Sequence, residues 1–437
     1  MRIGIIPDMI GSGGGVYQYS LTMLRALHDW KSDGCEDEFI VFADNAHHAA
    51  LMRFNGRNWT VNPMQCPSLH KQALDILRCI IGEGPHREAW RWLRGQLPGK
   101  GILPNADVVQ YRPEATRWLN NSGVDLMIYP NPTSLSFETG VPYIMAVHDL
   151  QHRLQPEFPE VSANGEWERR EYLFRNAIRN ATLILADSEV GKEDILNFYG
   201  SCGITPDRVK VLPFLPACYL GIHISEGERQ RVRKIYHLPE RYLFYPAQLW
   251  PHKNHTRIIR ALGLLKREHS LRIPAVFCGS HSGEIRKRTF HEAMSVSSQL
   301  GLEEEIHYLG YLPDGDMSAI YADAVALVMP TFFGPTNIPV LEAWAFGCPV
   351  LTSDIRGIRE QVENAAILVD PRSVEAIADG IYRLWTDENL RCTLAALGRQ
   401  RLGRYTPEDY GQRLVAILEE AKTRVCGQKS ESNKIPA

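Results

Sequence analysis

The stretch that most constrains the fold of this chain is 329–354, MPTFFGPTNIPVLEAWAFGCPVLTSD. It follows a short apolar run, 325–329, of the kind that forms a strand buried on both faces of a parallel sheet. Turn residues then interrupt the chain around Gly334, and Pro339 suits a first helical turn, where no N–H donor is needed. Gly347 ends the helix, and another apolar run follows. The pattern therefore predicts strand, loop, helix and strand, the repeating unit of a doubly wound α/β sheet.

This loop and helix place two chemical features side by side. The first N–H groups of a helix lack partners within it, so those near Thr336, Asn337 and Ile338 can bind an anion. Glu342 is expected in or near the first turn, where its carboxylate can accept from two neighbouring hydroxyls. A nucleotide sugar carries both matching groups, a diphosphate and a ribose diol. An ordinary helix start with a surface glutamate explains the same residues, and both interpretations stay open at this point.

The same stretch resembles the donor site of the family 4 retaining glycosyltransferases (glycosyl transferases group 1). Glu342 matches the second of two glutamates in the family motif, and the segment 347–350 matches its G-x-P-V ending. The first glutamate of the motif falls at Gly334, so one carboxylate of the family site is absent here. The resemblance implies the GT-B fold, in which two Rossmann-like, doubly wound parallel-sheet domains face a central cleft.

Composition excludes several other classes of protein. The 437 residues suffice for two or three domains, and the net charge of −3 gives no basic surplus that would indicate nucleic-acid binding. No apolar run has the length of a signal peptide or a transmembrane helix. The nine cysteines are scattered without C-x-x-C pairs, which favours reduced thiols. We therefore expect a cytoplasmic protein that binds no nucleic acid.

The amino-terminal half opens with an apolar strand, the glycine loop 11–15 and a helix. Bare backbone in such a loop lets an anion approach closely. The dinucleotide fingerprint G-x-G-x-x-G fails at Val16, and a nicotinamide-binding Rossmann oxidoreductase is kept as an alternative. The resemblance implies instead that Gly13, Gly14 and Gly15 face the donor diphosphate across the cleft.

Polar residues follow two further apolar runs, 125–129 and 143–147. In an open parallel sheet, residues just past the strand ends line the ligand crevice. Asn131 follows the first run, and His148 and Asp149 follow the second. A buried histidine bonded to backbone is the ordinary interpretation of such a residue. The resemblance implies that His148 reaches the transferred sugar, and Asn131 and Asp149 are acceptor-side candidates.

The second half repeats the order of strand, polar loop and helix. Lys253 in this loop can neutralise a phosphate as a point charge, although a surface lysine is the alternative interpretation. In the family, an arginine and a lysine of this loop grip the diphosphate; Lys253 matches the lysine, and Gln248 occupies the arginine position. His252 and His255 have no third metal ligand in view. The acidic pair at 314–316 reads as a turn and a helix N-cap, so no metal site is expected.

The segment 50–123 is the least readable part of the chain. Within it, 86–94 (HREAWRWLR) mixes tryptophans with arginines and can lie on an anionic membrane or contact a lipid-linked acceptor. A solvated helix whose tryptophans pack on the domain is the favoured interpretation. Peripheral contact with the inner face of a membrane is kept as an alternative.

Strand–helix alternation occurs twice, on either side of a proline-rich join, and predicts two doubly wound domains with a ligand cleft between them. We expect an acceptor-side Rossmann-like domain over 1–216 and a donor-binding Rossmann-like domain over 217–405. The resemblance implies that a helix over 406–426 crosses back to the first domain. The polar tail 427–437 is expected to be disordered.

The resulting hypothesis is a metal-independent retaining glycosyltransferase of the hexosyltransferase type, with a nucleotide-sugar donor and a glycan or lipid-linked acceptor. The resemblance implies bacterial cell-surface polysaccharide synthesis, such as that of lipopolysaccharide. It also implies a reaction on one face of the sugar, in which the leaving phosphate deprotonates the acceptor and no protein nucleophile takes part. No cofactor is expected. Alternatives are a catalytically silent GT-B protein that binds a sugar nucleotide or a partner transferase, and a sugar-nucleotide epimerase.

The residues of this hypothetical site have separate roles. Lys253 and helix N–H groups stabilise the charge that builds up on the leaving diphosphate, Glu342 holds the ribose and His148 contacts the sugar. These three are the expected catalytic residues. The expected donor-binding set is Gly13, Gly14, Gly15, Gln248, Lys253, Gly334, Thr336, Asn337, Ile338 and Glu342. The residues leave the base, the sugar, the acceptor and the linkage open.

Overall fold

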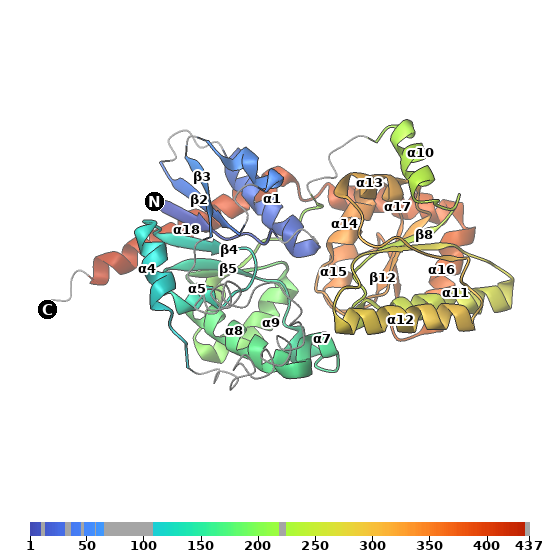
Figure 1. The fold of residues 1–437 in the computed structure, drawn as a ribbon, viewed down its shortest axis with the longest axis horizontal. Coiled ribbons are helices and arrows are strands. Elements are labelled where there is room, and N and C mark those ends of the chain that lie inside the picture. Colours follow the sequence, from blue (N-terminus) through green and yellow to red (C-terminus); the bar gives the residue numbers. More distant parts are fainter. Residues whose placement is uncertain are drawn as a thin grey trace, which may run out of the picture.

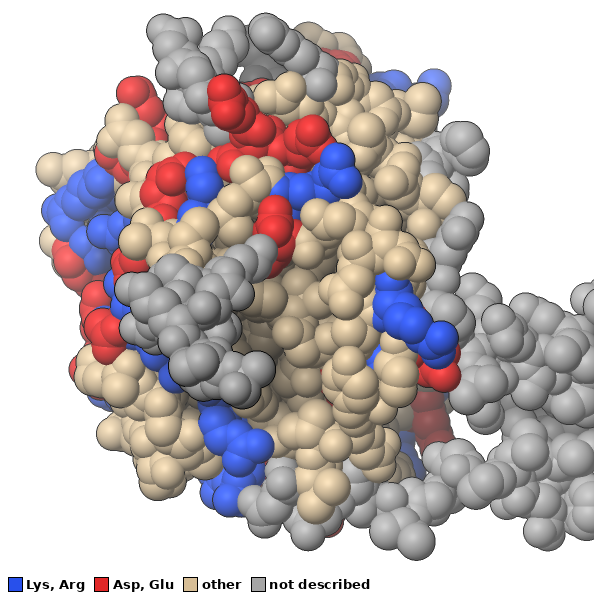
Figure 2. All heavy atoms as spheres, turned by 90° about the vertical axis from the view of Figure 1, so that its left-hand side faces the viewer, with Lys and Arg blue, Asp and Glu red and all other residues tan. Residues whose placement is uncertain are grey.

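The structure is a computed structural model that describes residues 1–9, 14–30, 36–44, 48–56, 58–64, 108–217 and 224–432. Its elements form two lobes, each a parallel sheet covered by helices (Figure 1). The predicted donor-binding Gly13 and the tryptophan-rich segment 86–94 lie outside the described residues. The face of the amino-terminal lobe in Figure 2 carries basic and acidic side chains interspersed, as suits the net charge of −3.

The amino-terminal lobe is built on a seven-stranded parallel sheet in the order β3-β2-β1-β4-β5-β6-β7. Its strands are β1 (Arg2–Ile5), β2 (Glu38–Ala43), β3 (Trp59–Pro63), β4 (Leu126–Tyr129), β5 (Tyr143–Val147), β6 (Leu183–Ala186) and β7 (Val209–Val211). Every residue of β4, β5 and β6 is buried, because helices cover both faces of the sheet. The strand order reverses at β1 and β4, where a ligand crevice is expected at the carboxyl ends.

The helices of this lobe connect the strands and cover the sheet. They are α1 (Gly15–Asp29), α4 (Pro113–Asn121), α5 (Leu135–Glu138), α6 (Gln151–Leu154), α7 (Pro159–Ser162), α8 (Glu166–Asn180) and α9 (Glu189–Tyr199). Helix α9 begins with Ser188 as its N-cap, and the Ser188 hydroxyl accepts the N–H of Gly191 at 3.0 Å.

The carboxy-terminal lobe is built on a six-stranded parallel sheet in the order β10-β9-β8-β11-β12-β13. Its strands are β8 (Leu243–Pro246), β9 (Ala275–Cys278), β10 (Ile306–Tyr308), β11 (Ala326–Met329), β12 (Val350–Ser353) and β13 (Ile367–Val369). Its helices are α10 (Glu226–Ile235), α11 (His255–His269), α12 (Glu284–Gln299), α13 (Asp314–Asp323), α14 (Ile338–Ala345), α15 (Ile358–Val362), α16 (Val374–Thr386) and α17 (Glu388–Leu402). The order β11, α14, β12 is the one predicted from the stretch 329–354.

The last helix, α18 (Pro407–Ser432), crosses back to the amino-terminal lobe, where Figure 1 shows it beside α1 and the strands. Tyr410, Leu414 and Leu418 are buried in the core that β1 and β2 help to form. The Nζ of Lys422 pairs with Asp37 at 2.5 Å. Helix α18 extends through Ser432, so residues 427–432 of the tail that we expected to be disordered are helical.

Candidate active site

A cavity of about 640 Å³ lies between the two lobes, at the carboxyl ends of both sheets. It is lined by most of the residues that the sequence singled out: Gly14, Gly15, His148, Asp149, Gln248, Lys253, Gly334, Thr336, Asn337, Ile338 and Glu342. Asn131 is not among the lining residues, and its amide donates to the carboxylate of Asp8 at 3.1 Å. The structure therefore brings the predicted donor and sugar residues together and leaves Asn131 outside the cavity wall.

Two helices point their amino-terminal ends into this cavity from opposite lobes. Helix α1 begins at Gly15 and α14 begins at Ile338, and a Cβ added to Gly15 would lie 3.6 Å from the Cδ1 of Ile338. Gly14 is the N-cap residue of α1 and Asn337 is that of α14. Neither residue caps its helix with a side-chain hydrogen bond. Because the first N–H groups and the dipole of each helix favour negative charge, the two ends converge on a place for an anion.

Lys253 adds a full positive charge to the same cavity. It ends the short turn Pro251–Lys253 after β8, and its carbonyl oxygen accepts from the Tyr245 hydroxyl at 2.9 Å. Burial lowers the pKa of Lys253 to about 8, although the carboxylates of Asp149 and Glu160 act in the opposite direction. The amine is therefore mostly protonated at neutral pH, and a small rise in pH is enough to remove its charge.

Gly334, which stands where the resembled motif has a glutamate, lies against the side chain of Asn337. Gly334 has a φ of 114°, and a Cβ added there would lie 3.2 Å from both terminal atoms of the Asn337 side chain. Asn337 is only 6% exposed, and its Nδ2 has no hydrogen-bond partner within the described part of the chain. A carboxamide thus occupies the space beside position 334 and offers an unsatisfied N–H group.

The backbone of Asn337 differs from what the sequence suggested. Its N–H donates to the Oε1 of Gln361 at 3.0 Å, and its carbonyl oxygen accepts from the Nε2 of Gln361 at 2.9 Å. The prediction that this N–H is free for an anion is therefore wrong, because a side chain of α15 occupies it. The double contact fixes the loop that precedes α14.

Glu342 lies deeper than the sequence suggested. The first turn of α14 holds no acidic residue, and Glu342 is its fifth residue, only 5% exposed. Its Oε2 accepts from the hydroxyl of Tyr321 on α13 at 2.7 Å. The carboxylate therefore lines the cavity in an orientation that Tyr321 fixes, and its place just past the first turn agrees with the prediction.

His148 follows β5 and enters the cavity as a neutral imidazole. Its Nε2 lies 2.8 Å from the carbonyl oxygen of Pro130, and because a carbonyl only accepts, Nε2 carries the proton. Burial lowers the pKa of His148, which favours the neutral form. The Tyr19 ring packs edge-on at 4.9 Å between centroids. The Nδ1 atom is then an acceptor that can take a hydrogen bond from a sugar hydroxyl.

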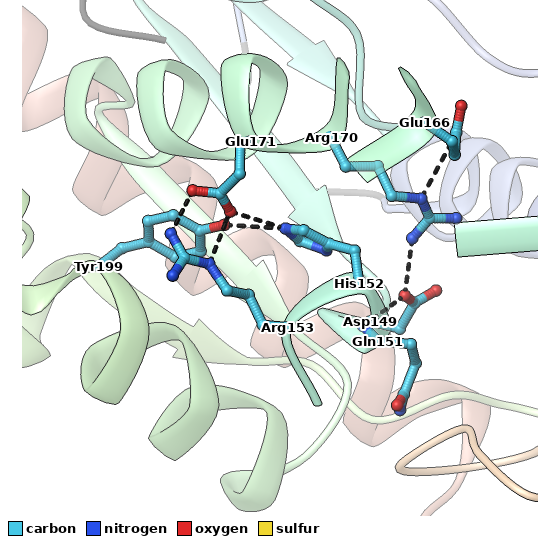
Figure 3. Close-up of polar contacts among 8 residues, drawn as sticks. All are labelled: Asp149, Gln151, His152, Arg153, Glu166, Arg170, Glu171 and Tyr199. Carbon is cyan, nitrogen blue, oxygen red and sulfur yellow. Dashed lines mark hydrogen bonds and ion pairs between the residues drawn. The ribbon is translucent and has the colours of Figure 1, made fainter. Parts of the chain in front are cut away.

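Asp149 is held by the neighbouring helix α8, as Figure 3 shows. The guanidinium of Arg170 donates to the Oδ1 of Asp149 at 3.1 Å and to the Oε1 of Glu166 at 3.1 Å. Burial alone would raise the pKa of Asp149, but the charge of Arg170 lowers it overall. Asp149 is therefore a fixed carboxylate at the edge of the cavity.

The next residue of α8, Glu171, anchors the other side of the same loop (Figure 3). Its Oε1 accepts from His152 Nε2 at 2.9 Å and from the Tyr199 hydroxyl at 2.7 Å, and Arg153 donates to both of its oxygens. Burial opposes ionisation, yet these hydrogen bonds lower the pKa of Glu171 to about 2. Successive residues of one helix thus hold the loop that carries His148 and Asp149.

Two contacts between the lobes were missed by sequence reasoning, and of their two acidic residues only Glu160 lines the cavity. Glu160 on α7 accepts from the backbone N–H of His252 at 3.0 Å and from its Nδ1 at 2.6 Å. Asp187, just past β6, accepts from the hydroxyl of Thr336. Burial raises the pKa of Asp187 to about 7. The rule that crevice residues follow strand ends points to Asp187, whereas no local pattern marks Glu160.

The two histidines considered as metal ligands have other partners. The ring of His252 stacks on Phe333 at 3.7 Å, and the ring of His255 stacks on Tyr245 at 4.7 Å. Among the described residues, no cluster of three or more histidine, cysteine, aspartate or glutamate side chains is placed to hold a metal ion. Within the same residues, no helix is both long and apolar enough to cross a membrane.

The acidic pair at 314–316 divides between separate partners. Asp314 accepts from the Nε2 of Gln18, across the cleft, at 3.1 Å. Asp316 pairs with Arg231 and accepts from the hydroxyl of Tyr236 at 2.7 Å. Asp314 is the first residue of α13 and Pro313 is its N-cap, which corrects the expected acidic cap.

Comparison with known proteins follows the same division of the chain. Residues 228–401 match the family model described as Glycosyl transferases group 1. O-antigen chain mannosyltransferase B of Escherichia coli is 28% identical over 253 residues, which are 57% of this chain and 64% of that protein. A D-inositol 3-phosphate glycosyltransferase of Corynebacterium glutamicum (strain R) is 24% identical over 258 residues, which are 57% and 60% of the two chains. The chain thus spans less than two thirds of the length of these relatives.

Solved structures match nearly the whole chain. HepE of Anabaena, in complex with UDP and glucose, has a TM-score of 0.68 at 18% identity, over 96% of this chain and 99% of that one. WaaG, a glycosyltransferase involved in lipopolysaccharide biosynthesis, has a TM-score of 0.62 at 14% identity, over 94% and 98%. These likenesses confirm the predicted GT-B fold.

Proposed function

We propose that this protein is a retaining glycosyltransferase, because residues 228–401 match the group 1 glycosyltransferase model and the chain has the GT-B fold. It moves a sugar from a nucleotide-sugar donor to a glycan or a lipid-linked acceptor. The observation that carries this proposal is the convergence of three positive features on one cavity: the amino-terminal ends of α1 and α14 and the ammonium of Lys253. A diphosphate leaving group is the anion such a place suits best.

The leaving diphosphate gains negative charge as the glycosidic bond breaks. Lys253 and the helix ends stand ready for that charge before reaction, so they stabilise the transition state more than the ground state. Each hydrogen bond to a charged group is worth about 1.5–3 kcal/mol. We assign this stabilisation to the protein rather than to a metal ion, and transfer that persists in a chelator such as EDTA is the expected result.

The sugar and the ribose are held by the neutral and acidic groups of the cavity. Nδ1 of His148 accepts a hydrogen bond from a hydroxyl of the transferred sugar, and Glu342 accepts from the ribose diol. The acceptor attacks on the face that the diphosphate leaves, and the departing phosphate takes the acceptor proton. The new bond then keeps the anomeric configuration, and no protein nucleophile is needed.

The setting proposed for this reaction is bacterial cell-surface polysaccharide synthesis. The names of the E. coli relative, an O-antigen chain mannosyltransferase, and of WaaG, which is involved in lipopolysaccharide biosynthesis, support it. A nucleotide sugar of the cytoplasm and an acceptor at the inner face of the membrane fit that setting. Peripheral membrane contact is part of the proposal for a lipid-linked acceptor.

The test begins with thermal-shift screening of the full chain against UDP-, GDP-, ADP- and TDP-sugars, because a ligand that binds the folded state raises its melting temperature. Donors that bind are then incubated with glycan acceptors, and the anomeric configuration of the product is read by NMR. A product of inverted configuration would refute the retaining assignment. Binding without transfer or hydrolysis would indicate a silent protein, and conversion of a donor incubated alone would indicate an epimerase.

A further inference from the structure

The side chain of Gln248, at the arginine position of the family motif, has a fixed orientation. Its Oε1 lies 2.5 Å from the Nη1 of Arg286 and 3.1 Å from the Nε1 of Trp250. A guanidinium and an indole N–H only donate, so the carboxamide oxygen must face them and its NH2 group must face away. The ambiguity that usually affects an amide side chain is thereby removed.

The NH2 group faces the opposite lobe. A Cβ added to Gly14, the residue that precedes α1, would lie 3.3 Å from the Nε2 of Gln248. Gln248, Trp250 and Gly14 all line the interlobe cavity. The amide N–H groups of Gln248 therefore project to the side of the cavity where the amino-terminal end of α1 also points.

The charged guanidinium of Arg286 lies on the oxygen side of this amide. Arg286 lies on α12, its guanidinium is 4.6 Å from the centre of the Trp250 ring, and it does not line the cavity. Its Nε is buried and has no hydrogen-bond partner among the described residues. A positive charge at the oxygen end of a carboxamide draws electron density from the nitrogen, which makes the N–H groups stronger donors.

We propose that Arg286 and Gln248 act as one unit in which Arg286 is a positioning residue and Gln248 donates to an oxygen of the donor diphosphate. This inference rests on the proposed function, because it names the residues that contact the donor. In this unit the neutral amide of Gln248, with the charge of Arg286 behind it, takes the place of the arginine of the family motif. Loss of the carboxylate at Gly334 accompanies this change, so the charge around the diphosphate is nearly preserved.

A double-mutant cycle tests the coupling directly. Binding of UDP and of GDP is measured by calorimetry for the full-length wild type and for Gln248→Ala, Arg286→Ala and the double variant. We expect each single variant to weaken binding of the nucleotide that the wild type prefers by about tenfold, and the double variant to bind no more weakly than Gln248→Ala. Arg286 then has no effect once its amide partner is gone, a result that a merely structural role would not give.

Two further variants sharpen the test. Gln248→Glu keeps an oxygen that accepts from Arg286 and Trp250 but has no N–H group. We therefore expect this variant to bind the diphosphate more weakly than Gln248→Ala. Arg288→Ala, on an exposed position of the same helix, is the matched control and should leave binding unchanged. Additive losses in the cycle, or unchanged binding by Gln248→Ala, would overturn the inference alone. A wild type that binds none of UDP, GDP, ADP and TDP would overturn the proposed function with it.

Discussion

The carboxylate of Asp187 in the amino-terminal lobe accepts a hydrogen bond from the hydroxyl of Thr336 in the loop before α14. Ser188 also donates to Asp187, at 3.0 Å. The contact joins the end of β6 to the proposed diphosphate site of the other lobe. It buries an acidic group that is only 4% exposed, with the charge of Asp149 nearby. Its protonation therefore couples the contact between the lobes to pH.

The first prediction concerns the pH dependence of stability at Asp187. Its pKa is about 7 in the folded protein, against an ordinary value of 3.8 in the unfolded chain. The folded state holds this proton more tightly, so the resulting stabilisation is complete below pH 3.8 and is lost as the pH rises through 7. The side chain of Asp187→Asn cannot ionise, and we expect the variant to gain melting temperature relative to wild type across this range. Melting curves at several pH values measure it.

A control separates this effect from ordinary surface charge. Asp379→Asn alters an exposed carboxylate and should track the wild type at every pH. If the difference in melting temperature between Asp187→Asn and wild type were constant with pH, the assigned titration would be wrong.

The second prediction is that Lys253→Ala lowers turnover at least tenfold while the fold persists. The lost charged contact is worth about 1.5–3 kcal/mol in the transition state, which corresponds to a tenfold to more than hundredfold loss of rate. Initial rates of sugar transfer measure it, with Lys287→Ala, an exposed lysine of α12, as the matched control. Wild-type turnover by Lys253→Ala would remove this residue from the mechanism.

The third prediction is a loss of donor affinity above pH 8. The pKa of Lys253 is about 8, and an anion binds only the protonated form well. Affinity for a nucleotide sugar should therefore be steady below this pKa and fall about tenfold per pH unit above it. Lys253→Arg keeps a charge that does not titrate in this range, so calorimetry on that variant should show a flat profile. A falling profile in Lys253→Arg would assign the dependence to another group.

The fourth prediction is that Gly334→Glu does not restore a family-like site. The backbone at Gly334 has a φ of 114°, and a Cβ there meets the Asn337 side chain at 3.2 Å. We expect a loss of stability of about 1–3 kcal/mol and no gain in activity. Gly334→Ala isolates the backbone contribution, and Gly315→Glu is the control, because nothing lies within 4 Å of a Cβ added there. Increased transfer by Gly334→Glu would show that the missing carboxylate limits this site.

The fifth prediction concerns Glu171, which anchors the loop that carries His148 and Asp149. Glu171→Ala leaves His152 and Arg153 without their buried partner, and we expect it to cost about 3–5 kcal/mol of unfolding free energy. The pKa of Glu171 is about 2 in the folded state against 4.5 ordinarily, so its contribution is present above pH 4.5 and is lost as the pH falls towards 2. Urea unfolding at neutral and acidic pH measures both effects. Glu168→Gln, exposed on the same helix, should change neither.

The sequence by itself determined the alternation of strands and helices, the parallel sheets and the gathering of His148, Lys253 and Glu342 in one cavity. These follow from local signals, because buried parallel strands are continuous apolar runs and residues past their ends face a shared crevice. The stretch 329–354 also fixed the family resemblance. Each strand, helix and loop among these features depends on residues that are close together along the chain, whereas the shared site of His148, Lys253 and Glu342 was implied by the family resemblance.

Only the tertiary structure decided which polar groups of the site already have hydrogen-bond partners and which residues fix their orientation. Gln361 takes the N–H of Asn337, Tyr321 orients Glu342, and Arg286 turns the amide of Gln248 towards Gly14. Such contacts join residues far apart in sequence, and no periodicity of a single strand or helix records them. Their geometry is set by the packing of whole elements, which a local pattern does not contain.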